Sequence, residues 1–367
     1  MIATLGPGGA EAVMSRLTAG LARRGHTVTL ITLSGTESDF HPLDRGVHRI
    51  ALSSMGDSRG LLHALVATIR RLLALRRAIR EVKPQVVLSF VDATNLLTLL
   101  ALVGTGIPVV VSERIDPRHH PIGSIRTRLR PYLYRWLASA LVVQTNDVVP
   151  WAMEFLPRNK IWVIPNAVPN RNDVNMAPFA PPANEPSLIH QRTIVAMGRL
   201  NPQKGFDLLL EAWKTVSPRF PDWNLVILGE GPERSRLDML AREMPRVSLP
   251  GKVQHPTTLL RQAGLFVLSS RYEGFPNALL EAMASGLPCL STKCPSGPSD
   301  MIQSGENGLL VEPGCSDALA EGLARLLQDN DLRKSLSRCA ASSVERFSPE
   351  VVWPLWESCL RGEQPQD

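Results

Sequence analysis

The sequence has no hydrophobic run that reaches the roughly 20 apolar residues needed for a membrane-spanning helix. Its longest apolar stretch, 96–111, is interrupted by threonine, glycine and proline, so it is predicted to form a helix, a turn and a strand. No signal peptide is visible at the N-terminus. Together these absences predict a cytoplasmic protein.

Cysteine is scarce, which argues against a disulfide framework. The five cysteines lie in the second half without metal-ligand spacing: Cys289, Cys294, Cys315, Cys339 and Cys359. His119 and His120 are adjacent, which is poor spacing for a metal, and Asp329-Asn330-Asp331 is predicted to be a turn and a helix cap. We therefore expect no disulfide and no metal cofactor.

Acidic residues are scarce in only one half of the chain. Residues 1–168 hold 20 Lys and Arg against 11 Asp and Glu, a net charge of +9, and 18 of the 20 are arginines. Residues 169–367 hold 20 against 23, a net charge of −3. A length of 367 residues favours two domains, and the basic first half favours an anionic partner.

The stretch 265–291 carries the strongest chemical pattern. It is predicted to form a strand, a polar loop, a helix over 277–285 and a second strand, with Pro276 at the first helical position. Two carboxylates, Glu273 and Glu281, stand eight positions apart around the start of this helix. The unpaired amides of its first turn, together with the helix dipole, attract phosphate.

A ligand with hydroxyl groups at both ends and phosphate between them fits this arrangement, as in a nucleotide-sugar. The amides would come from Asn277, Ala278 and Leu279, Glu281 would bind a ribose diol, and Glu273 would face the sugar. For an isolated pair of glutamates, a helix-start residue and a solvated residue would be the simpler explanation. The residues around the pair weaken that explanation, and a second motif follows along the chain.

This second motif is G-R-L-N-P-Q-K-G at 198–205, which follows a predicted strand over 193–198. Arg199 and Lys204 place two cations on one short loop at the carboxyl end of that strand. They are predicted to neutralise a diphosphate and to stabilise it as it leaves. The alternative is a solvated basic loop.

Strands alternate with helices along both halves, which predicts an α/β fold with doubly wound parallel sheets. The first strand is short, since only Met1 to Leu5 precede the glycine turn of Gly6, Gly8 and Gly9. This start suggests a truncation or a wrongly assigned first codon, and it puts the stability of the first sheet in doubt.

The segment E-G-F-P-N-A-L-L-E at 273–281, followed by A-M-A-S-G-L-P, resembles the EX7E signature of the retaining glycosyltransferases of family 4. Two further segments, G-P-G-G-A-E at 6–11 and W-V-I-P-N-A-V at 162–168, are similar to other motifs of that family. The resemblance covers nearly the whole chain. It implies the GT-B fold, in which two Rossmann-like domains face each other and the active site lies in the cleft.

The resemblance also assigns domains and roles. Residues 1–168 would bind the acceptor, 169–348 would bind the nucleotide-sugar, and the helix in 349–367 would cross back to the first domain. Glu273, Arg199 and Lys204 would be catalytic, Gly8 and Gly9 would contact the donor, and the backbone at Lys252 and Val253 would meet the nucleobase. The implied reaction is metal-independent and uses a nucleotide-sugar, with UDP as the expected nucleotide.

Family members often carry a histidine near the transferred sugar at the end of a first-domain strand, where this chain has Glu113 and Arg114. Glu113 and Arg114 are therefore the catalytic candidates expected at that position. The segment S-E-R-I-D-P at 112–117 resembles a branch linked to exopolysaccharide and lipid-linked glycan assembly. A glycan or polyprenyl-diphosphate-linked acceptor is therefore expected.

Three alternatives remain open from the sequence: a nucleotide-sugar epimerase, a sugar-phosphate synthase, and a non-catalytic protein that binds sugar nucleotides as a scaffold. Arginine clusters at 70–80 and 126–135, with Leu72, Leu73 and Leu129 as apolar neighbours, predict reversible binding to the anionic cytoplasmic membrane face. The alternative is an ordinary solvated arginine surface. No nucleic-acid partner is expected.

Overall fold

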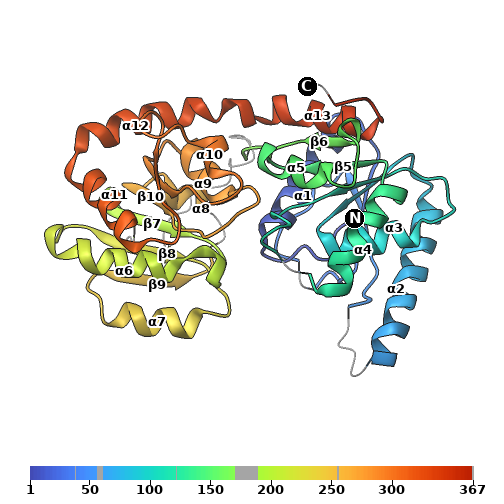
Figure 1. Ribbon diagram of the computed structural model, residues 1–367, viewed down its shortest axis with the longest axis horizontal. Coiled ribbons are helices and arrows are strands. Elements are labelled where there is room, and N and C mark those ends of the chain that lie inside the picture. The colour runs from blue at the N-terminus through green and yellow to red at the C-terminus, as the bar shows by residue number, and fades with distance from the viewer. Residues whose placement is uncertain (38, 56–60, 121, 170–188, 254–255, 366–367) are drawn as a thin grey trace. The chain divides into compact units, whose positions relative to one another are not determined.

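The computed structural model describes residues 1–37, 39–55, 61–120, 122–169, 189–253 and 256–365. The chain divides into two compact units (Figure 1). Unit 1 comprises Met1–Ala167 together with Pro349–Asp367, and unit 2 comprises Val168–Ser348. The last helix therefore belongs to the same unit as the first residues of the chain.

Unit 2 is built on a six-stranded parallel sheet in the order β9-β8-β7-β10-β11-β12. Its strands are β7 (Thr193–Met197), β8 (Asn224–Leu228), β9 (Val247–Gly251), β10 (Leu265–Leu268), β11 (Cys289–Thr292) and β12 (Leu309–Val311). The chain moves outward from β7 in one direction and then, from β10, in the other. The order therefore reverses between β7 and β10, which is where open α/β sheets bind their ligands.

Helices cover both faces of this sheet. They are α6 (Phe206–Val216), α7 (Arg234–Arg242), α8 (Pro256–Leu260), α9 (Asn277–Ala284), α10 (Pro298–Met301), α11 (Ser316–Gln328) and α12 (Asn330–Ser343). Successive residues of β7 alternate between two cores: Ile194 packs with α6 and α11, whereas Val195 packs with α9. This alternation explains why the strand is apolar throughout, since a parallel strand is buried on both faces.

Unit 1 contains a two-stranded and a four-stranded parallel sheet, in the orders β1-β2 and β3-β4-β5-β6. The strands are β1 (Val28–Thr32), β2 (Val47–Ala51), β3 (Val87–Phe90), β4 (Val109–Ser112), β5 (Ala140–Val143) and β6 (Ile161–Val163). Together with unit 2, these sheets confirm the predicted α/β fold with parallel sheets in two domains.

A strand was predicted over residues 1–5, but the structure has only a single bridge there, between Ile2 and Thr32. The segment nevertheless joins the two sheets of unit 1. The amide of Ile2 donates to the carbonyl of Ile31 (3.2 Å), and the amide of Phe90 donates to the carbonyl of Met1 (3.0 Å). Ile2 is buried at 1% exposure. These few residues therefore lie between β1 and β3, in the middle of the unit.

The helices of unit 1 are α1 (Gly9–Arg23), α2 (Leu61–Val82), α3 (Asp92–Ala101), α4 (Ser124–Leu137), α5 (Val149–Met153) and α13 (Pro349–Leu360). Helix α13 packs on α1, where the indole of Trp353 occupies the space that a side chain at Gly20 would fill. Arg24 donates two hydrogen bonds of 2.8 Å to Glu357, which lower the pKa of that carboxyl to about 2. Among the described residues, none of the helices is long and apolar enough to cross a membrane.

Candidate active site

The loops that follow β7 and β10 meet where the strand order of unit 2 reverses. Lys204, after β7, donates from its ammonium group to Glu273, after β10, with 2.6 Å between Nζ and Oε1. The hydroxyl of Ser270 donates to the same oxygen at 2.6 Å. Glu273 is buried at 4% exposure. Two residues that the sequence assigned to catalysis, 69 positions apart, are thus in direct contact.

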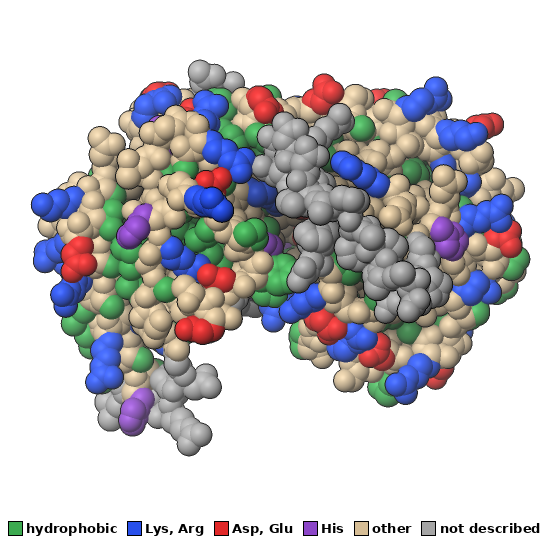
Figure 2. Space-filling model, turned by 180° about the vertical axis from the view of Figure 1, so that it is seen from behind, with side chains coloured by type: hydrophobic (Ala, Val, Ile, Leu, Met, Phe, Trp, Pro, Cys, Tyr) green, Lys and Arg blue, Asp and Glu red, His purple; other side chains and the backbone are tan. Residues whose placement is uncertain are grey.

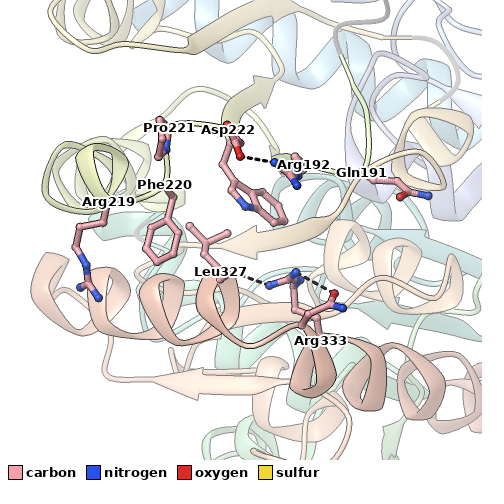
Figure 3. Close-up of a pocket in the computed structure, with 10 residues that line it drawn as sticks. Gln191, Arg192, Arg219, Phe220, Pro221, Asp222, Leu327 and Arg333 are labelled. Carbon is pink, nitrogen blue, oxygen red and sulfur yellow. Dashed lines mark hydrogen bonds and ion pairs between the residues drawn. The ribbon is translucent and has the colours of Figure 1, made fainter.

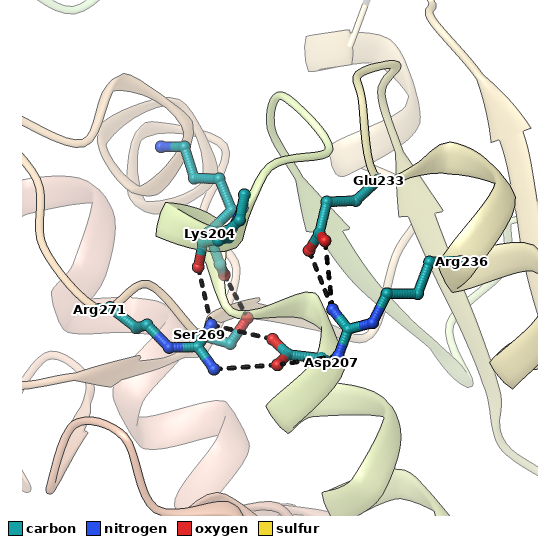
Figure 4. A network of polar contacts seen from close by, with 7 residues as sticks. Lys204, Asp207, Glu233, Arg236, Ser269 and Arg271 are labelled. Carbon is teal, nitrogen blue, oxygen red and sulfur yellow. Dashed lines mark hydrogen bonds and ion pairs between the residues drawn. The ribbon is translucent and has the colours of Figure 1, made fainter.

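Glycine makes the approach of these two loops possible. Gly205 has a φ of +62°, and a side chain there would collide with the carbonyl oxygen of Ser269. The hydroxyl of Ser269 in turn donates to the carbonyl of Lys204 at 2.9 Å (Figure 4). At Gly198, a Cβ would lie 3.2 Å from the Lys204 side chain. Both glycines of the motif therefore leave space for Lys204 and its loop.

A second ion pair braces the same loops from another side. Arg271 donates two hydrogen bonds of 2.9 Å to Asp207, the second residue of α6, and one of 2.7 Å to the carbonyl of Pro202 (Figure 4). Arg236 lies 3.7 Å from Asp207 and 3.2 Å from Glu233. The sequence did not reveal this bracing role of Arg271, because its partner Asp207 lies 64 residues away.

Arg199 differs from Lys204 in its surroundings. Its side chain is exposed and has no hydrogen bond or ion pair to another residue within the described part of the chain. A guanidinium at the carboxyl end of a central strand, with no partner among the described residues, is available to an anionic ligand.

Helix α9 begins beside Glu273 and presents its first turn without a side-chain cap. Pro276 was predicted to be the first helical residue. The structure instead makes it the capping residue (φ −76°, ψ 89°). The helix starts at Asn277, where Asn277 and Ala278 are half-buried and the Leu279 side chain is in the core. Glu281 is half-buried in the second turn. The helix start therefore offers amide groups, with Glu273 before it and Glu281 within it.

The residues predicted to meet the nucleobase lie at the same edge of the sheet, two strands from β7. Lys252 and Val253 follow β9 directly; Lys252 is exposed, and Val253 packs partly against the core. The carbonyl of Gly251 accepts a hydrogen bond from the amide of Gly229 at 2.8 Å, which joins the ends of β8 and β9.

In unit 1, the glycine turn leads into α1 as predicted. Gly8 precedes the helix and Gly9 is its first residue, and no side chain caps this helix start. Glu11 folds back over the turn, because its carboxylate accepts from the Thr4 hydroxyl at 3.1 Å. A side chain at Gly8 would collide with that carboxylate.

Glu113 lies at the end of β4, but its carboxylate is buried inside unit 1. The Tyr134 hydroxyl donates to Oε1 at 2.6 Å, and Arg130 lies 3.6 Å away. Burial raises the pKa of Glu113 to about 7, against the lowering effects of Arg130 and Tyr134. Arg114 is held above the ring of Phe90 at 4.4 Å.

Two arginines of the clusters predicted to bind the membrane have structural roles instead, so not every member of either cluster is exposed. Arg130 is 2% exposed and packs against Glu113. Arg76 donates to the carbonyls of Ala101 and Val103, both at 2.9 Å, at the end of α3. The spacing of arginines along a helix did not distinguish these inward-facing residues from exposed ones.

Within the described ranges, no three His, Cys, Asp or Glu side chains gather as a group that could hold a metal ion. Arg199 and Lys204 are cations that the protein itself supplies at this site.

Comparison with known families and structures places both units. Residues 7–171 match the family model "Glycosyltransferase Family 4", and residues 191–329 match "Glycosyl transferases group 1". An exopolysaccharide phosphotransferase of Streptomyces coelicolor is 33% identical over 290 residues; the match covers 76% of this chain but only 30% of that protein. A Campylobacter jejuni α-1,4-N-acetyl-D-galactosaminyltransferase, named for an undecaprenol-diphosphate-linked glycan, is 27% identical over 97% of this chain and 96% of its own length.

Solved structures show the same fold. A Thermosynechococcus elongatus sucrose-phosphate synthase superposes with a TM-score of 0.79 at 18% identity, covering 98% of this chain and 97% of that one. Anabaena HepE in complex with UDP superposes with a TM-score of 0.73 at 17% identity, covering 98% of each chain. At such identities the likeness establishes the GT-B fold and leaves the reaction to other evidence.

Proposed function

The chain belongs to glycosyltransferase family 4, and we propose that it transfers a sugar from a UDP-sugar to a glycan acceptor with retention of the anomeric configuration. The observation that carries this proposal is the contact between Lys204 and Glu273 where the strand order of unit 2 reverses. Exposed Arg199 precedes Lys204 in the loop after β7, and α9, whose start has no side-chain cap, follows Glu273 after β10. Cations, a carboxylate and helix amides therefore come from the same edge of one sheet.

Each part has a distinct task in this reaction. Lys204, Arg199 and the α9 amides stabilise the negative charge that grows on UDP as the bond between the sugar and the diphosphate breaks. Glu273, held by Lys204 and Ser270, accepts hydrogen bonds from sugar hydroxyl groups, and Glu281 accepts them from the ribose. Because the protein's own cations supply the positive charge, we propose that the transfer needs no divalent metal.

For the acceptor, we propose a lipid-diphosphate-linked glycan. The protein would bind the membrane surface peripherally through unit 1 and so reach this acceptor. Helix α4 exposes a regularly spaced apolar stripe consisting of Ile125, Leu129, Tyr132 and Trp136, with Trp136 77% exposed. The spacing of four, three and four places these side chains on one helix face. The exposed residues Arg126, Arg128 and Arg135 flank the stripe.

Helix α2 has a similar exposed stripe of Leu65, Val66, Ile69 and Leu73. Figure 2 shows Lys and Arg side chains next to hydrophobic ones on the surface of unit 1. Apolar side chains beside arginines suit the boundary between lipid headgroups and acyl chains. The Campylobacter relative, whose name includes an undecaprenol-linked glycan, supports such an acceptor.

The experiment is a UDP-release assay with a panel of UDP-sugars and a polyprenyl-diphosphate-linked glycan, with and without EDTA. We expect release that depends on the acceptor, survives EDTA and is lost in Glu273→Ala. Release that requires a sugar phosphate as acceptor would instead identify a synthase. Binding of UDP-sugar without any turnover would identify a scaffold.

A further inference from the structure

A second concave site lies in unit 2 at the opposite edge of the sheet from Arg199 and Lys204. It is a pocket of about 480 Å³, formed where β7 and β8 begin (Figure 3). Four segments line it: 191–192 before β7, 219–223 before β8, Leu327 at the end of α11, and Asn330 with Arg333 at the start of α12. Nothing in the proposed transfer uses this pocket.

The charge of the pocket is opposite to that of its surroundings. Three arginines line it, namely Arg192, Arg219 and Arg333, against a single acid, Asp222, which is paired with Arg192. The lining thus carries a formal charge of +2, although residues 169–367 have a net charge of −3. The concentration of arginine here is therefore not explained by the average composition of this half.

Arg333 is held in place by the protein, so its position does not depend on a ligand. It donates to the carbonyl of Leu327 at 2.9 Å and to Asn330 at 3.0 Å, and its guanidinium lies 5.2 Å from the centre of the Trp223 ring. Burial lowers the pKa of Arg333; Asp329 opposes this, and the nearby Arg192 lowers it further. Two guanidinium groups close enough to repel each other are stabilised by an anion between them.

The remaining lining is apolar and suits the body of a small molecule. Phe220 is half-buried with Arg219 above its ring at 5.6 Å, and Leu327 and Trp223 are buried at the inner side. A volume of this size is typical of small-ligand sites, which combine apolar walls with a few charged groups.

We propose that this pocket binds the phosphate monoester of a small phosphorylated metabolite, such as a sugar phosphate. Arg192 and Arg333 would lie at the phosphate, Arg219 would add positive charge to the same lining, and Phe220 and Leu327 would lie beside the carbon skeleton. A phosphate monoester carries close to two negative charges at neutral pH and so matches the charge of +2. Arginine is suited to this role because its planar group donates to two phosphate oxygens at once. The site is separate from the proposed UDP-sugar site.

The test is a thermal-shift titration of the full chain with inorganic phosphate and with glucose 6-phosphate, at constant ionic strength, using glucose as the uncharged control. We expect saturable stabilisation by both phosphates and none by glucose. The double variant Arg192→Ala/Arg219→Ala should weaken phosphate binding by about tenfold or more, whereas Arg192→Lys/Arg219→Lys should retain most of it. The matched control Arg261→Ala/Arg325→Ala removes two unit 2 arginines that do not line the pocket and should leave binding unchanged.

A third double variant, Arg199→Ala/Lys204→Ala, separates this site from the proposed donor site. We expect it to keep the phosphate-dependent stabilisation. If that variant loses the effect while Arg192→Ala/Arg219→Ala keeps it, phosphate binds only at the donor loops and this inference is wrong. An absence of saturable stabilisation in the unchanged chain also overturns it, without bearing on the transferase activity.

Discussion

The ammonium group of Lys204 lies 2.6 Å from a carboxylate oxygen of Glu273 and thereby joins the loop after β7 to the loop after β10. The two side chains are only 17% and 6% exposed. Each is therefore the main countercharge of the other at a largely buried position. This contact has consequences for stability as well as for the proposed transfer.

Lys204→Met should destabilise the protein by about 3 kcal/mol, because it leaves the Glu273 carboxylate buried without its cation. Adding Glu273→Gln to that variant should restore part of the loss, since the neutral amide no longer needs a partner. Urea unfolding of the two single variants and the double variant measures the coupling between the residues. Purely additive effects would show that the contact contributes nothing to stability.

Arg199→Ala should leave the stability unchanged, because its exposed side chain has no partner among the described residues. Turnover should nevertheless fall more than the donor KM rises, since the charge on the leaving UDP grows in the transition state. Steady-state kinetics with a saturating acceptor separates the two constants. If only KM changes, Arg199 contributes to ground-state binding alone.

Glu281→Ala should weaken binding of UDP by roughly 1.5–3 kcal/mol, the range for hydrogen bonds to a charged group. Glu281→Gln should lose less, since its amide oxygen still accepts one bond from the ribose. Calorimetry with UDP measures both, and UMP serves as a second ligand that keeps the ribose. Unchanged affinity in the alanine variant removes Glu281 from the proposed site.

The sequence predicted the parallel sheets and the loops of unit 2 well, because the relevant signals are local. Lys204 lies just after an apolar strand, within a glycine-containing turn, and Glu273 follows another such strand. Parallel strands place their carboxyl ends at one edge, so the contact between these residues follows from the strand order. No local signal near Arg271 indicates that it pairs with Asp207, and for this reason that ion pair was missed.

Unit 1 shows the limits of the same reasoning. Arg128 and Arg130 are two positions apart on one helix, yet the first is exposed and the second is buried against Glu113. Helical spacing predicts which residues share a face, but the identity of the inner face depends on tertiary packing. A short strand was predicted for the first residues, whereas the structure has a single bridge there and shows that these residues still join β1 to β3.

Compared with the unchanged chain, the Glu113→Gln variant should gain in free energy of unfolding as the pH rises. In the folded chain the pKa of Glu113 is about 7, above its usual value of 4.5, so between these values the folded state holds a proton that the unfolded state releases. The stability from this group is fully present below pH 4.5 and is lost as the pH rises through 7. The shift corresponds to about 3 kcal/mol.

Urea unfolding at pH 5 and pH 8 tests this expectation as a difference between the variant and the unchanged chain. The glutamine should still accept the Tyr134 hydroxyl, so the fold is preserved. Glu154→Gln, at an exposed glutamate of the same unit, controls for the loss of one surface carboxylate. Parallel pH profiles for Glu113→Gln and the unchanged chain would falsify the expectation.

Liposome co-sedimentation should show that the chain binds anionic vesicles at low salt and is released at high salt, because surface arginines contribute about 1 kcal/mol each near an anionic leaflet and salt screens them. Arg126→Glu/Arg128→Glu should abolish this binding, since both side chains are exposed on α4. Trp136→Ser should weaken it at every salt concentration, because the lost contribution is apolar. Arg130 is not a suitable target, since it is buried against Glu113.

Two controls make the membrane result specific. Arg261→Glu/Arg325→Glu changes the net charge by the same amount on unit 2 and should leave vesicle binding intact. UDP affinity should be the same in the α4 variants as in the unchanged chain, because the substituted residues lie in unit 1 and the proposed UDP site lies in unit 2. If both charge reversals reduce binding equally, the attraction depends on net charge alone and not on the stripe of α4. If the unchanged chain ignores anionic vesicles even at low salt, a soluble acceptor replaces the lipid-linked one.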